Sequence, residues 1–327
     1  MRLIALALLL ASCASPAASG DASVDVTSLD RGAVDASLDV SAGDSTAAPA
    51  CAACAGYALE AGNPRVASAD LDELSGIVES RRTPGVFFTH NDSGDTARFF
   101  AIDARGRLLA EYALVGATAV DWEDVASAPC GAEQCLYFAD MGDNNLARSD
   151  YAVYRVREPE VPASPPATVR PVVVPWERLP FRYPDGVHNA ETLLAHAATG
   201  DLYVVTKVET GSSGVYRFPA ASQGMTETTL TRVATLDLPA SGAVLVTGGS
   251  LHPCEPRLLL RTYVKLFEYV LPEGRPFEAI FTATAREMPF RAERQGEAVG
   301  WRTNGRGYVT VSEGNGPSLN LFGCEQP

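Results

Sequence analysis

The chain has 327 residues, of which 46% are hydrophobic, enough to bury a large core. Its 40 acidic and 26 basic residues give a formal net charge of −14. This acidic balance, together with the absence of a basic stripe and of any recognised nucleic-acid motif, excludes a nucleic acid polymer as the expected partner.

The first thirteen residues predict an export signal. Arg2 supplies the charged start, and Leu3 to Leu10 form an apolar run too short to span a bilayer as a helix. The stretch LASC that ends at Cys13 resembles the bacterial lipoprotein signal, in which the Cys is lipidated and becomes the mature N-terminus. We expect Cys13 to carry the lipid that is the chain's sole link to the membrane; an ordinary cleaved signal with an incidental Cys is the alternative. Ala14 follows Cys13, which resembles outer-membrane sorting in Gram-negative lipoproteins.

Residues 14–50 predict a flexible tether between the signal and a folded domain. They are rich in Ala, Ser and Asp, with six Asp, one Arg and no aromatic residue. Such a segment cannot bury enough apolar surface to fold. No later stretch is apolar enough to span a membrane, so we expect residues 51–327 to form one monomeric domain outside the cytoplasm.

The six remaining cysteines predict disulfides, because an even number in an exported chain is typical of an oxidised framework. Cys130 and Cys135 flank a short loop before a strand and are the expected pair. The pairing of the others stays open, and the first choice joins neighbours in sequence, Cys51 with Cys54 and Cys254 with Cys324. A zinc site is the alternative for the Cys51–Cys54 spacing.

Five pairs of short segments repeat along the rest of the chain. The pairs are ELSGIV with GVFFTH, DWEDVA with CLYFAD, NAETLL with DLYVVT, LVTGGSL with RLLLRT, and GEAVGW with GYVTVS. Each first segment has a polar anchor near its start, and the anchors are Ser75, Glu123, Glu191, Thr247 and Glu297. The second strand starts 11, 13, 11, 11 and 11 residues after the anchor, at Val86, Leu136, Leu202, Leu258 and Tyr308.

Each of the first four units has room for a third and a fourth strand. We expect these strands at 97–103 and 108–114, 150–156 and 172–181, 214–218 and 230–238, and 265–271 and 279–288. The last unit has only 318–323 before the chain ends, so residues 64–70 are the candidate for its missing outer strand.

Four-stranded units at a near-constant period predict an all-β fold, a β-propeller of five blades closed by an N-terminal strand. A sixth blade would require that the longest interval between anchors, 68 residues, hide another unit. We expect this interval to hold the Pro-rich loop EPEVPASPPATVRPVVVP instead. A β-sandwich, or two of them, is the other alternative.

The anchors predict a metal site on the propeller axis. The first strand of each blade lines the axis, so three carboxylates and two hydroxyls converge there and repel one another without a counter-charge. An all-oxygen ring without His or Cys suits Ca²⁺. Two alternatives remain open: Lys207 and Arg261 neutralise the acids as buried ion pairs, or the Glu side chains are protonated. Ser250 competes with Thr247 as the hydroxyl of the fourth unit.

The five units resemble the calcium-activated apyrases, a five-bladed propeller family that hydrolyses nucleoside diphosphates. In that family Ser and Glu residues from the inner strands hold a central Ca²⁺, and the positions that match are Ser75, Glu123, Glu191 and Glu297. NDSGDTARFFAID resembles the family's acidic turn, and the likeness spans about residues 65 to 315 as a pattern. The segment TKVETGSSG is shorter and less Arg-rich than its apyrase counterpart. The chain also resembles bacterial secreted propellers labelled phytase-like.

These resemblances imply a Ca²⁺-dependent hydrolase of small anionic phosphate esters or anhydrides, displayed on the cell envelope. The expected general base is Asp92 or Asp143, with His90 as the alternate. The residues expected to contact the substrate are Lys207, Arg261, Asn91 and Asn144. The alternatives are structural: both Asp residues cap turns, His90 is a satisfied rim residue, and Trp122 packs between blades.

A non-catalytic binding propeller, with a structural metal or ion pairs, is the competing functional class. A lactonase is a lesser enzymatic alternative, because other propellers also use an axial metal.

Overall fold

The computed structural model describes residues 51–62, 64–239 and 245–325, and every structural statement below concerns these residues. The chain divides into Met1–Thr46 and Ala47–Pro327, and the described residues belong to the second unit. The predicted signal (1–13) and tether (14–50) lie outside the described residues. Within the described part, no helix has both the length and the apolar character needed to cross a bilayer.

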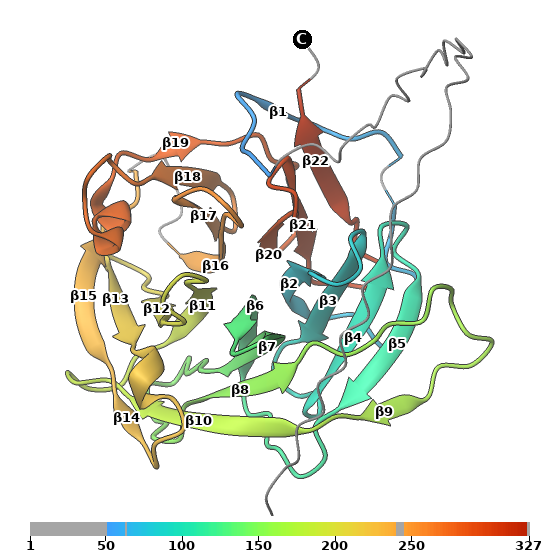
Figure 1. Cartoon of the computed structure of the whole chain (residues 1–327), viewed down its shortest axis with the longest axis horizontal. Helices are drawn as coiled ribbons and strands as arrows, with labels where there is room; N and C mark the ends of the chain where they lie inside the picture. Colours follow the sequence, from blue (N-terminus) through green and yellow to red (C-terminus); the bar gives the residue numbers. More distant parts are fainter. Residues whose placement is uncertain (1–50, 63, 240–244, 326–327) are drawn as a thin grey trace, which may run out of the picture. The chain divides into compact units, whose positions relative to one another are not determined.

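Five small sheets surround one axis and form a five-bladed β-propeller, which confirms the predicted fold class and blade number (Figure 1). Each blade has an inner strand that contacts the inner strands of the blades on both sides. The inner strands are β2 (Leu74–Glu79), β6 (Trp122–Cys130), β11 (Ala190–Ala195), β16 (Val246–Leu251) and β20 (Gly296–Trp301).

Most strands outside each inner strand follow in chain order, and the outermost strands of blades 1, 2 and 5 come from elsewhere in the chain. Blade 1 adds β3 (Val86–Asn91), β4 (Arg98–Asp103), β5 (Leu108–Ala113) and β9 (Pro171–Val173). Blade 2 adds β7 (Glu133–Asp140), β8 (Ala152–Arg157), β10 (Trp176–Arg182) and β14 (Thr228–Thr229). Blade 3 adds β12 (Leu202–Thr206), β13 (Ser213–Phe218) and β15 (Thr231–Leu236). Blade 4 adds β17 (Arg257–Thr262), β18 (Leu266–Val270) and β19 (Arg286–Glu287), and blade 5 adds β21 (Gly307–Ser312), β22 (Asn320–Cys324) and β1 (Tyr57–Leu59).

The core lies between neighbouring blades, so the strands near the axis are buried on both faces. All residues of β3, β11, β12 and β21 are buried. Between blades 1 and 2, for example, the rings of Phe99 and Phe138 lie 4.6 Å apart, and Trp122 stacks on Phe138 at 5.1 Å. Packing between blades explains why these segments contain nearly continuous apolar runs. It also places Trp122 in the core, in agreement with the expectation that this residue packs between blades.

The N-terminal segment closes the ring, but not with the predicted residues. β1 pairs antiparallel with β22 of blade 5, with Tyr57 opposite Cys324. The expected strand at 64–70 makes only an isolated bridge, between Arg65 and Ser318. The reason is aromatic packing: the Tyr57 ring lies 5.4 Å from Tyr308 of blade 5, a contact that the 64–70 segment has no aromatic ring to make.

The disulfides are partly as expected. Cys130–Cys135 is present, which confirms that prediction. The pairing of neighbours among the other four cysteines is wrong, because the bonds are Cys51–Cys254 and Cys54–Cys324. These two bonds attach the N-terminal segment that contains β1 to blades 4 and 5. A bond between Cys51 and Cys54 would stay within that segment and would not attach it to either blade. Three disulfides indicate an oxidising, exported environment.

The 68-residue interval holds no sixth blade. Its Pro-rich part crosses to blade 1, where β9 pairs parallel with β5. One expected outer strand is largely absent: residues 279–288 contain most of a 3-10 helix, η2 (Phe277–Thr282), and only the two-residue β19. The apolar side chains of η2 recur at helical spacing, which buries Ile280 and Phe281 together. A second short 3-10 helix, η1 (Ala220–Ser222), follows β13.

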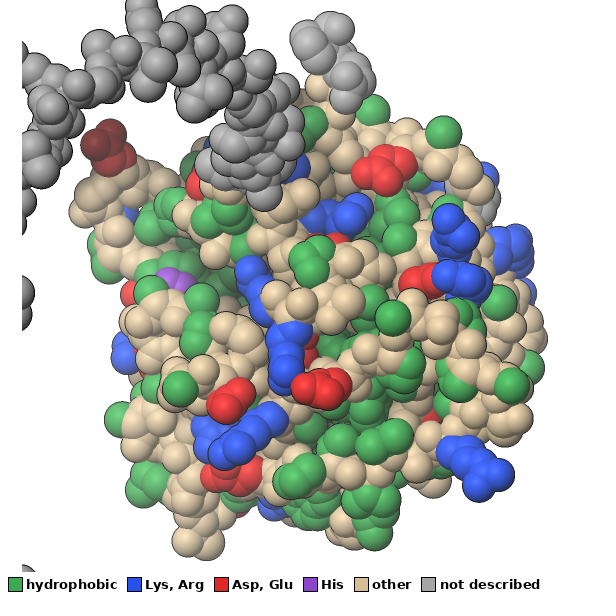
Figure 2. Space-filling view, turned by 45° about the vertical axis from the view of Figure 1, so that its right-hand side comes forward, with side chains coloured by type: hydrophobic (Ala, Val, Ile, Leu, Met, Phe, Trp, Pro, Cys, Tyr) green, Lys and Arg blue, Asp and Glu red, His purple; other side chains and the backbone are tan. Residues whose placement is uncertain are grey.

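The exterior mixes both signs of charge. In Figure 2, Lys and Arg side chains lie beside Asp and Glu side chains, with apolar patches between them.

Candidate axial metal site

The five predicted anchors occupy equivalent positions in the structure. Each is the second residue of its inner strand, and the pairing register slips at or beside that residue in all five blades. A bulge of this kind leaves the residue out of the ladder and re-aims its side chain. The fold therefore brings the anchors to one end of the axis, which we call the acidic end. They are Ser75, Glu123, Glu191, Thr247 and Glu297.

A second ring of side chains lies at the acidic end, formed by the residue that follows each second strand. Its members are Asp92, Met141, Lys207, Tyr263 and Glu313. In four blades the backbone N–H of this residue donates to the carbonyl two residues before the anchor, as Asp92 does to Glu73 at 2.8 Å. This repeated bond holds the second ring beside the first.

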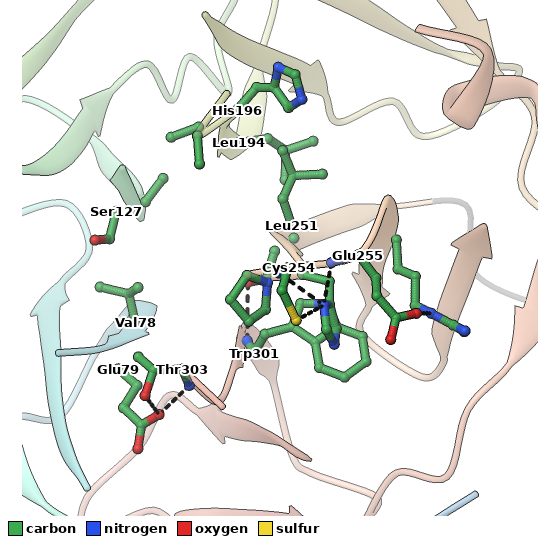
Figure 3. Close-up of a pocket in the computed structure, with 18 of the residues that line it drawn as sticks. Val78, Glu79, Ser127, Leu194, His196, Leu251, Cys254, Glu255, Trp301 and Thr303 are labelled. Carbon is green, nitrogen blue, oxygen red and sulfur yellow. Dashed lines mark hydrogen bonds and ion pairs between the residues drawn. The ribbon is translucent and has the colours of Figure 1, made fainter. Parts of the chain in front are cut away.

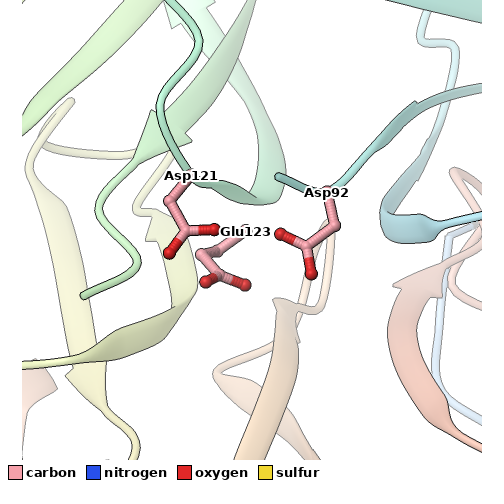
Figure 4. Close-up of side chains that lie close together, drawn as sticks. All are labelled: Asp92, Asp121 and Glu123. Atoms are coloured by element: carbon pink, nitrogen blue, oxygen red, sulfur yellow. The ribbon is translucent and has the colours of Figure 1, made fainter. Parts of the chain in front are cut away.

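Six carboxyl groups interact at the acidic end, and we call them the axial acid group. They are Asp92, Asp121, Glu123, Glu191, Glu297 and Glu313. Asp92, Asp121 and Glu123 each offer an oxygen within 4.8 Å of the others, and their carboxylates point toward one another in Figure 4. All the donors are oxygens, as a hard divalent cation prefers.

Burial and mutual repulsion raise the pKa of these carboxyl groups. Burial, followed by repulsion from Asp121, raises the pKa of Asp92 to about 8. Burial, followed by repulsion from Glu191, raises the pKa of Glu297 to about 8 and that of Glu123 well above its ordinary value. One oxygen of Glu297, Oε2, is buried without a hydrogen-bond partner. Such a group is protonated or is compensated by a cation.

Gly142 allows two of the carboxylates to approach the backbone of blade 2. A Cβ atom at this position would overlap the side-chain oxygens of Glu123 and Asp121. Only glycine leaves that space free. The glycine of the sequence GDNN is therefore explained by close packing against the acids and not by a left-handed turn, since its φ is not positive.

The hydroxyl anchors are used between blades. Ser75 Oγ donates to the Glu123 carbonyl at 2.6 Å, and Thr247 Oγ1 donates to the Gly296 carbonyl at 2.9 Å. Each hydroxyl thus ties its inner strand to the inner strand of a neighbouring blade. The competing hydroxyl, Ser250, accepts from the Trp301 N–H at 3.1 Å and lies toward the opposite end of its strand.

Lys207 forms an ion pair within the axial acid group, whereas Arg148 acts on Asp121 but pairs with Asp140. The Nζ of Lys207 pairs with Glu191 and contacts the Tyr263 hydroxyl at 2.7 Å. Burial lowers the pKa of Lys207, but the Glu191 carboxylate outweighs burial and the net shift is upward. Burial still leaves the pKa of Glu191 raised, to about 7, despite this pair. Lys207 and Arg148 together do not balance six carboxyl groups.

Arg261 does not lie among the axial acids. It is buried, its guanidinium pairs with Glu293, and its Nη1 donates to the Ala298 carbonyl at 2.9 Å. Glu293 also accepts from Thr310 Oγ1 at 2.8 Å, so the pair is part of the packing between blades 4 and 5. This placement leaves Arg261 no free face for a substrate, and it corrects the sequence expectation.

His90 and Asp143 are also committed to the fold. His90 is fully buried against Trp122, and burial lowers its pKa to about 4. Asp143 accepts from the Tyr151 hydroxyl at 2.6 Å and from the backbone N–H groups of Ala147 and Arg148. These hydrogen bonds overcome the opposing effect of burial and lower the pKa of Asp143. Of the three expected bases, Asp92 alone belongs to the axial acid group.

The two predicted asparagines differ in their contacts. Asn91 Nδ2 donates to the Asp70 carbonyl at 2.7 Å and to Asp95 at 2.9 Å, which fixes the turn after β3. Asn144 is exposed and accepts from Asn189 Nδ2 at 3.1 Å, so it joins the loops of blades 2 and 3 beside Lys207.

Sequence reasoning missed Asp121, Glu313 and Asp124. Glu313 could have been found by taking the residue after each second strand, and Asp121 by taking the residue two before each anchor. Asp124 is buried and accepts N–H groups from Val125 at 2.8 Å and Leu193 at 2.9 Å, and from Gly249. It links the inner strands of blades 2, 3 and 4, and no local sequence signal marks it.

A cavity of about 260 Å³ lies at the opposite end of the inner strands. Its wall is mainly apolar, with Val78, Leu194 and Leu251 around it (Figure 3). Glu79 lines it too, but its carboxylate already accepts from Thr303 Oγ1 at 2.9 Å and pairs with Arg302 at 3.0 Å. The axial acids lie at the other end of the same strands, so this cavity is separate from the candidate site.

In comparisons with known proteins, no protein-family model and no curated protein matches the chain. Among solved structures, a gluconolactonase from Xanthomonas campestris is 12% identical and has a TM-score of 0.42, with 77% of this chain and 72% of that chain covered. A chain of a nidogen–laminin complex is 10% identical and has a TM-score of 0.41, with 74% and 73% covered. This likeness concerns the fold alone. The strand pairing described above defines the protein as a five-bladed β-propeller with an acidic axial end.

Proposed function

We propose that the axial acid group binds a divalent cation of the Ca²⁺ class and that the protein uses it to hydrolyse phosphate esters or anhydrides. The observation that carries the proposal is the imbalance at the acidic end, where six buried or half-buried carboxyl groups face two cations, Lys207 paired with Glu191 and Arg148 near Asp121. The donor set fits a hard cation, because all donors are oxygens and the buried Oε2 of Glu297 lacks a partner.

Asp121 and Glu123 would hold the cation, with Glu191 and Glu297 beside them. When bound, such a cation neutralises the carboxylates and supplies Lewis-acid polarisation of a phosphoryl oxygen or a water. Asp92 is the candidate general base, because its carboxylate lies next to those of Asp121 and Glu123 and so beside a water that the cation would polarise. Lys207 orients Glu191 through their ion pair.

The test is phosphate release from aryl phosphates, nucleoside diphosphates and phytate, in Ca²⁺ and in chelator. We expect Ca²⁺-dependent release, with Asp92→Asn lowering turnover at least about 100-fold, the usual contribution of a general base. Asp150→Asn is the matched control, since Asp150 is an exposed acid of blade 2. Equal turnover in Asp92→Asn and the wild type would contradict the assigned base.

A non-catalytic binding propeller is the second candidate, favoured by a specific observation. Three residues expected to serve catalysis or substrate binding, His90, Asp143 and Arg261, have structural partners instead. For this candidate we expect Ca²⁺ binding without phosphate release from any substrate class, and without hydrolysis of an aldonolactone, which covers the lactonase alternative.

We also propose that the chain is exported and anchored by lipid at Cys13. The three disulfides support export, and the lipoprotein-like stretch LASC supports lipidation. Expressed in a Gram-negative host, the wild type should partition into the detergent phase on Triton X-114 separation and Cys13→Ala into the aqueous phase. Identical partitioning of the two proteins would refute the anchor.

A further inference from the structure

A second cavity adjoins the axial acid group. It has a volume of about 430 Å³ and lies between the loop after β7 in blade 2, the segment before β11 and the loop after β12 in blade 3. Lys207 belongs to its wall and also pairs with Glu191, so the cavity and the axial acids share this side chain. A molecule whose phosphate reached the axial cation would place its remainder here.

Two aliphatic side chains lie at the rim of this otherwise mixed cavity, and one of them is held in a preformed turn. Leu146 and Val187 line it with 56% and 40% of their surface exposed. Leu146 has a φ of 52°, and it is the one non-glycine residue with a positive φ in the described part of the chain. Its N–H donates to the Asp143 carbonyl at 2.9 Å, and the Asp143 N–H donates to Asn189 Oδ1 at 2.8 Å. A strained residue held in place by its surroundings, with an apolar side chain at a cavity, indicates a binding role.

The charges of the cavity do not suit a polyanion. Lys207 is the one Lys or Arg among the described residues that line it, and Glu191 already neutralises that lysine. Glu209 adds an exposed carboxylate, and His188 is held by Asp185 and Tyr216 at 3.0 Å each. A second phosphate would meet no free positive charge here, whereas an uncharged aliphatic group would contact Leu146 and Val187.

We infer that this cavity receives the uncharged, aliphatic part of the substrate, so that the preferred substrates are phosphomonoesters of apolar alcohols and not polyphosphates. The inference rests on the proposed function, because the axial cation is what would hold the phosphate end. It assigns Leu146 a role in specificity, through contact with the organic group.

Two non-hydrolysable ligands with the same head group provide the test. Binding of butylphosphonate and methylphosphonate is measured by isothermal titration calorimetry at saturating Ca²⁺. We expect the butyl compound to bind about 10-fold more tightly, which is the low end of the range usual for an extra hydrocarbon contact. Methylenediphosphonate, which adds a second charged group, should bind no more tightly than methylphosphonate.

Leu146→Asn removes the aliphatic contact and keeps a residue that tolerates positive φ. In this variant we expect the butyl preference to disappear while methylphosphonate binding stays unchanged. Val115→Asn is the control, because Val115 is a 65% exposed valine of blade 1 outside the cavity. Ca²⁺ binding without a butyl preference, or a preference that persists in Leu146→Asn, overturns the inference alone. Absence of Ca²⁺ binding overturns the proposed function as well.

Discussion

The carboxyl groups of the acidic end are the residues on which the account depends. Burial and repulsion between the acids raise their pKa, and the pKa values of Asp92 and Glu297, about 8, favour the protonated form at neutral pH when no cation is bound. A divalent cation would displace those protons. Ca²⁺ binding should therefore be coupled to pH in a direction that the structure fixes.

Thermal stability should show this coupling. The pKa values of Glu191, Glu297 and Asp92 in the folded protein are about 7, 8 and 8, against about 4 in an unfolded chain. A carboxyl group with a raised folded pKa contributes its full stability below pH 4, and that contribution is lost as pH rises through the folded pKa. In chelator, Tm should thus fall between pH 5.5 and 8.5, and Ca²⁺ should raise Tm much more at pH 8.5.

Differential scanning calorimetry at these two pH values, with and without Ca²⁺, measures the effect. Glu297→Gln should weaken the pH dependence in chelator, because the glutamine cannot ionise. A Ca²⁺-induced shift of equal size at both pH values would contradict the assigned pKa directions.

The anchors could be predicted from sequence because each stands at a fixed distance before a strongly apolar second strand. Asp121 stands two residues before an anchor and was overlooked, whereas Asp124 could not be predicted, because its role depends on contacts across blades. Asp124 is one residue from Glu123, yet it faces Leu193 and Gly249 of other blades. Arg261 was misjudged for the same reason, since its partner Glu293 comes from a loop 32 residues away.

Strands near the axis were easier to predict than strands at the rim. β3 and β12 start at Val86 and Leu202, as expected, because they are buried on both faces and their sequences are almost entirely apolar. The outer elements are partly exposed and carry weaker patterns, so β1 and η2 were misassigned. Extra strands such as β9 join a blade that their sequence position does not suggest.

The closing element depends on its disulfides for stability. β1 has three residues and only one of them is buried, so its pairing with β22 is weak by itself. Cys54–Cys324 closes a sequence separation of 270 residues, whereas Cys130–Cys135 closes one of 5. Because Cys51–Cys254 is also present, the loop that Cys54–Cys324 closes has 3 residues (54−51) plus 70 residues (324−254). On chain-entropy grounds this closure stabilises by about 2 kcal/mol more than the shorter one.

Double Cys→Ala variants of each pair allow a direct comparison. Denaturant unfolding without reductant should show a lower free energy of unfolding for Cys54→Ala/Cys324→Ala than for Cys130→Ala/Cys135→Ala, by about 2 kcal/mol. Equal losses would show that β1 is not what keeps the ring closed.

The whole molecule is a scaffold that brings residues far apart in sequence to one axis. Ser75 and Glu297 are separated by most of the domain, yet their strands β2 and β20 are neighbours once the ring closes. This convergence concentrates acidic side chains at one end of the axis and leaves a cavity of mixed polarity at the other end. The central claim is that the acidic end is built for a divalent cation.

Isothermal titration of the purified protein with Ca²⁺ at pH 8, after chelator treatment and dialysis, tests that claim most directly. We predict one tight Ca²⁺ site per chain. In Glu123→Gln we predict that the affinity for Ca²⁺ falls at least about 10-fold, the loss seen when a residue that supports a metal site is replaced. Glu160→Gln is the control, since the Glu160 side chain is 91% exposed and is not part of the axial acid group. Absence of a saturable site, or equal affinity in Glu123→Gln and the wild type, would contradict the account.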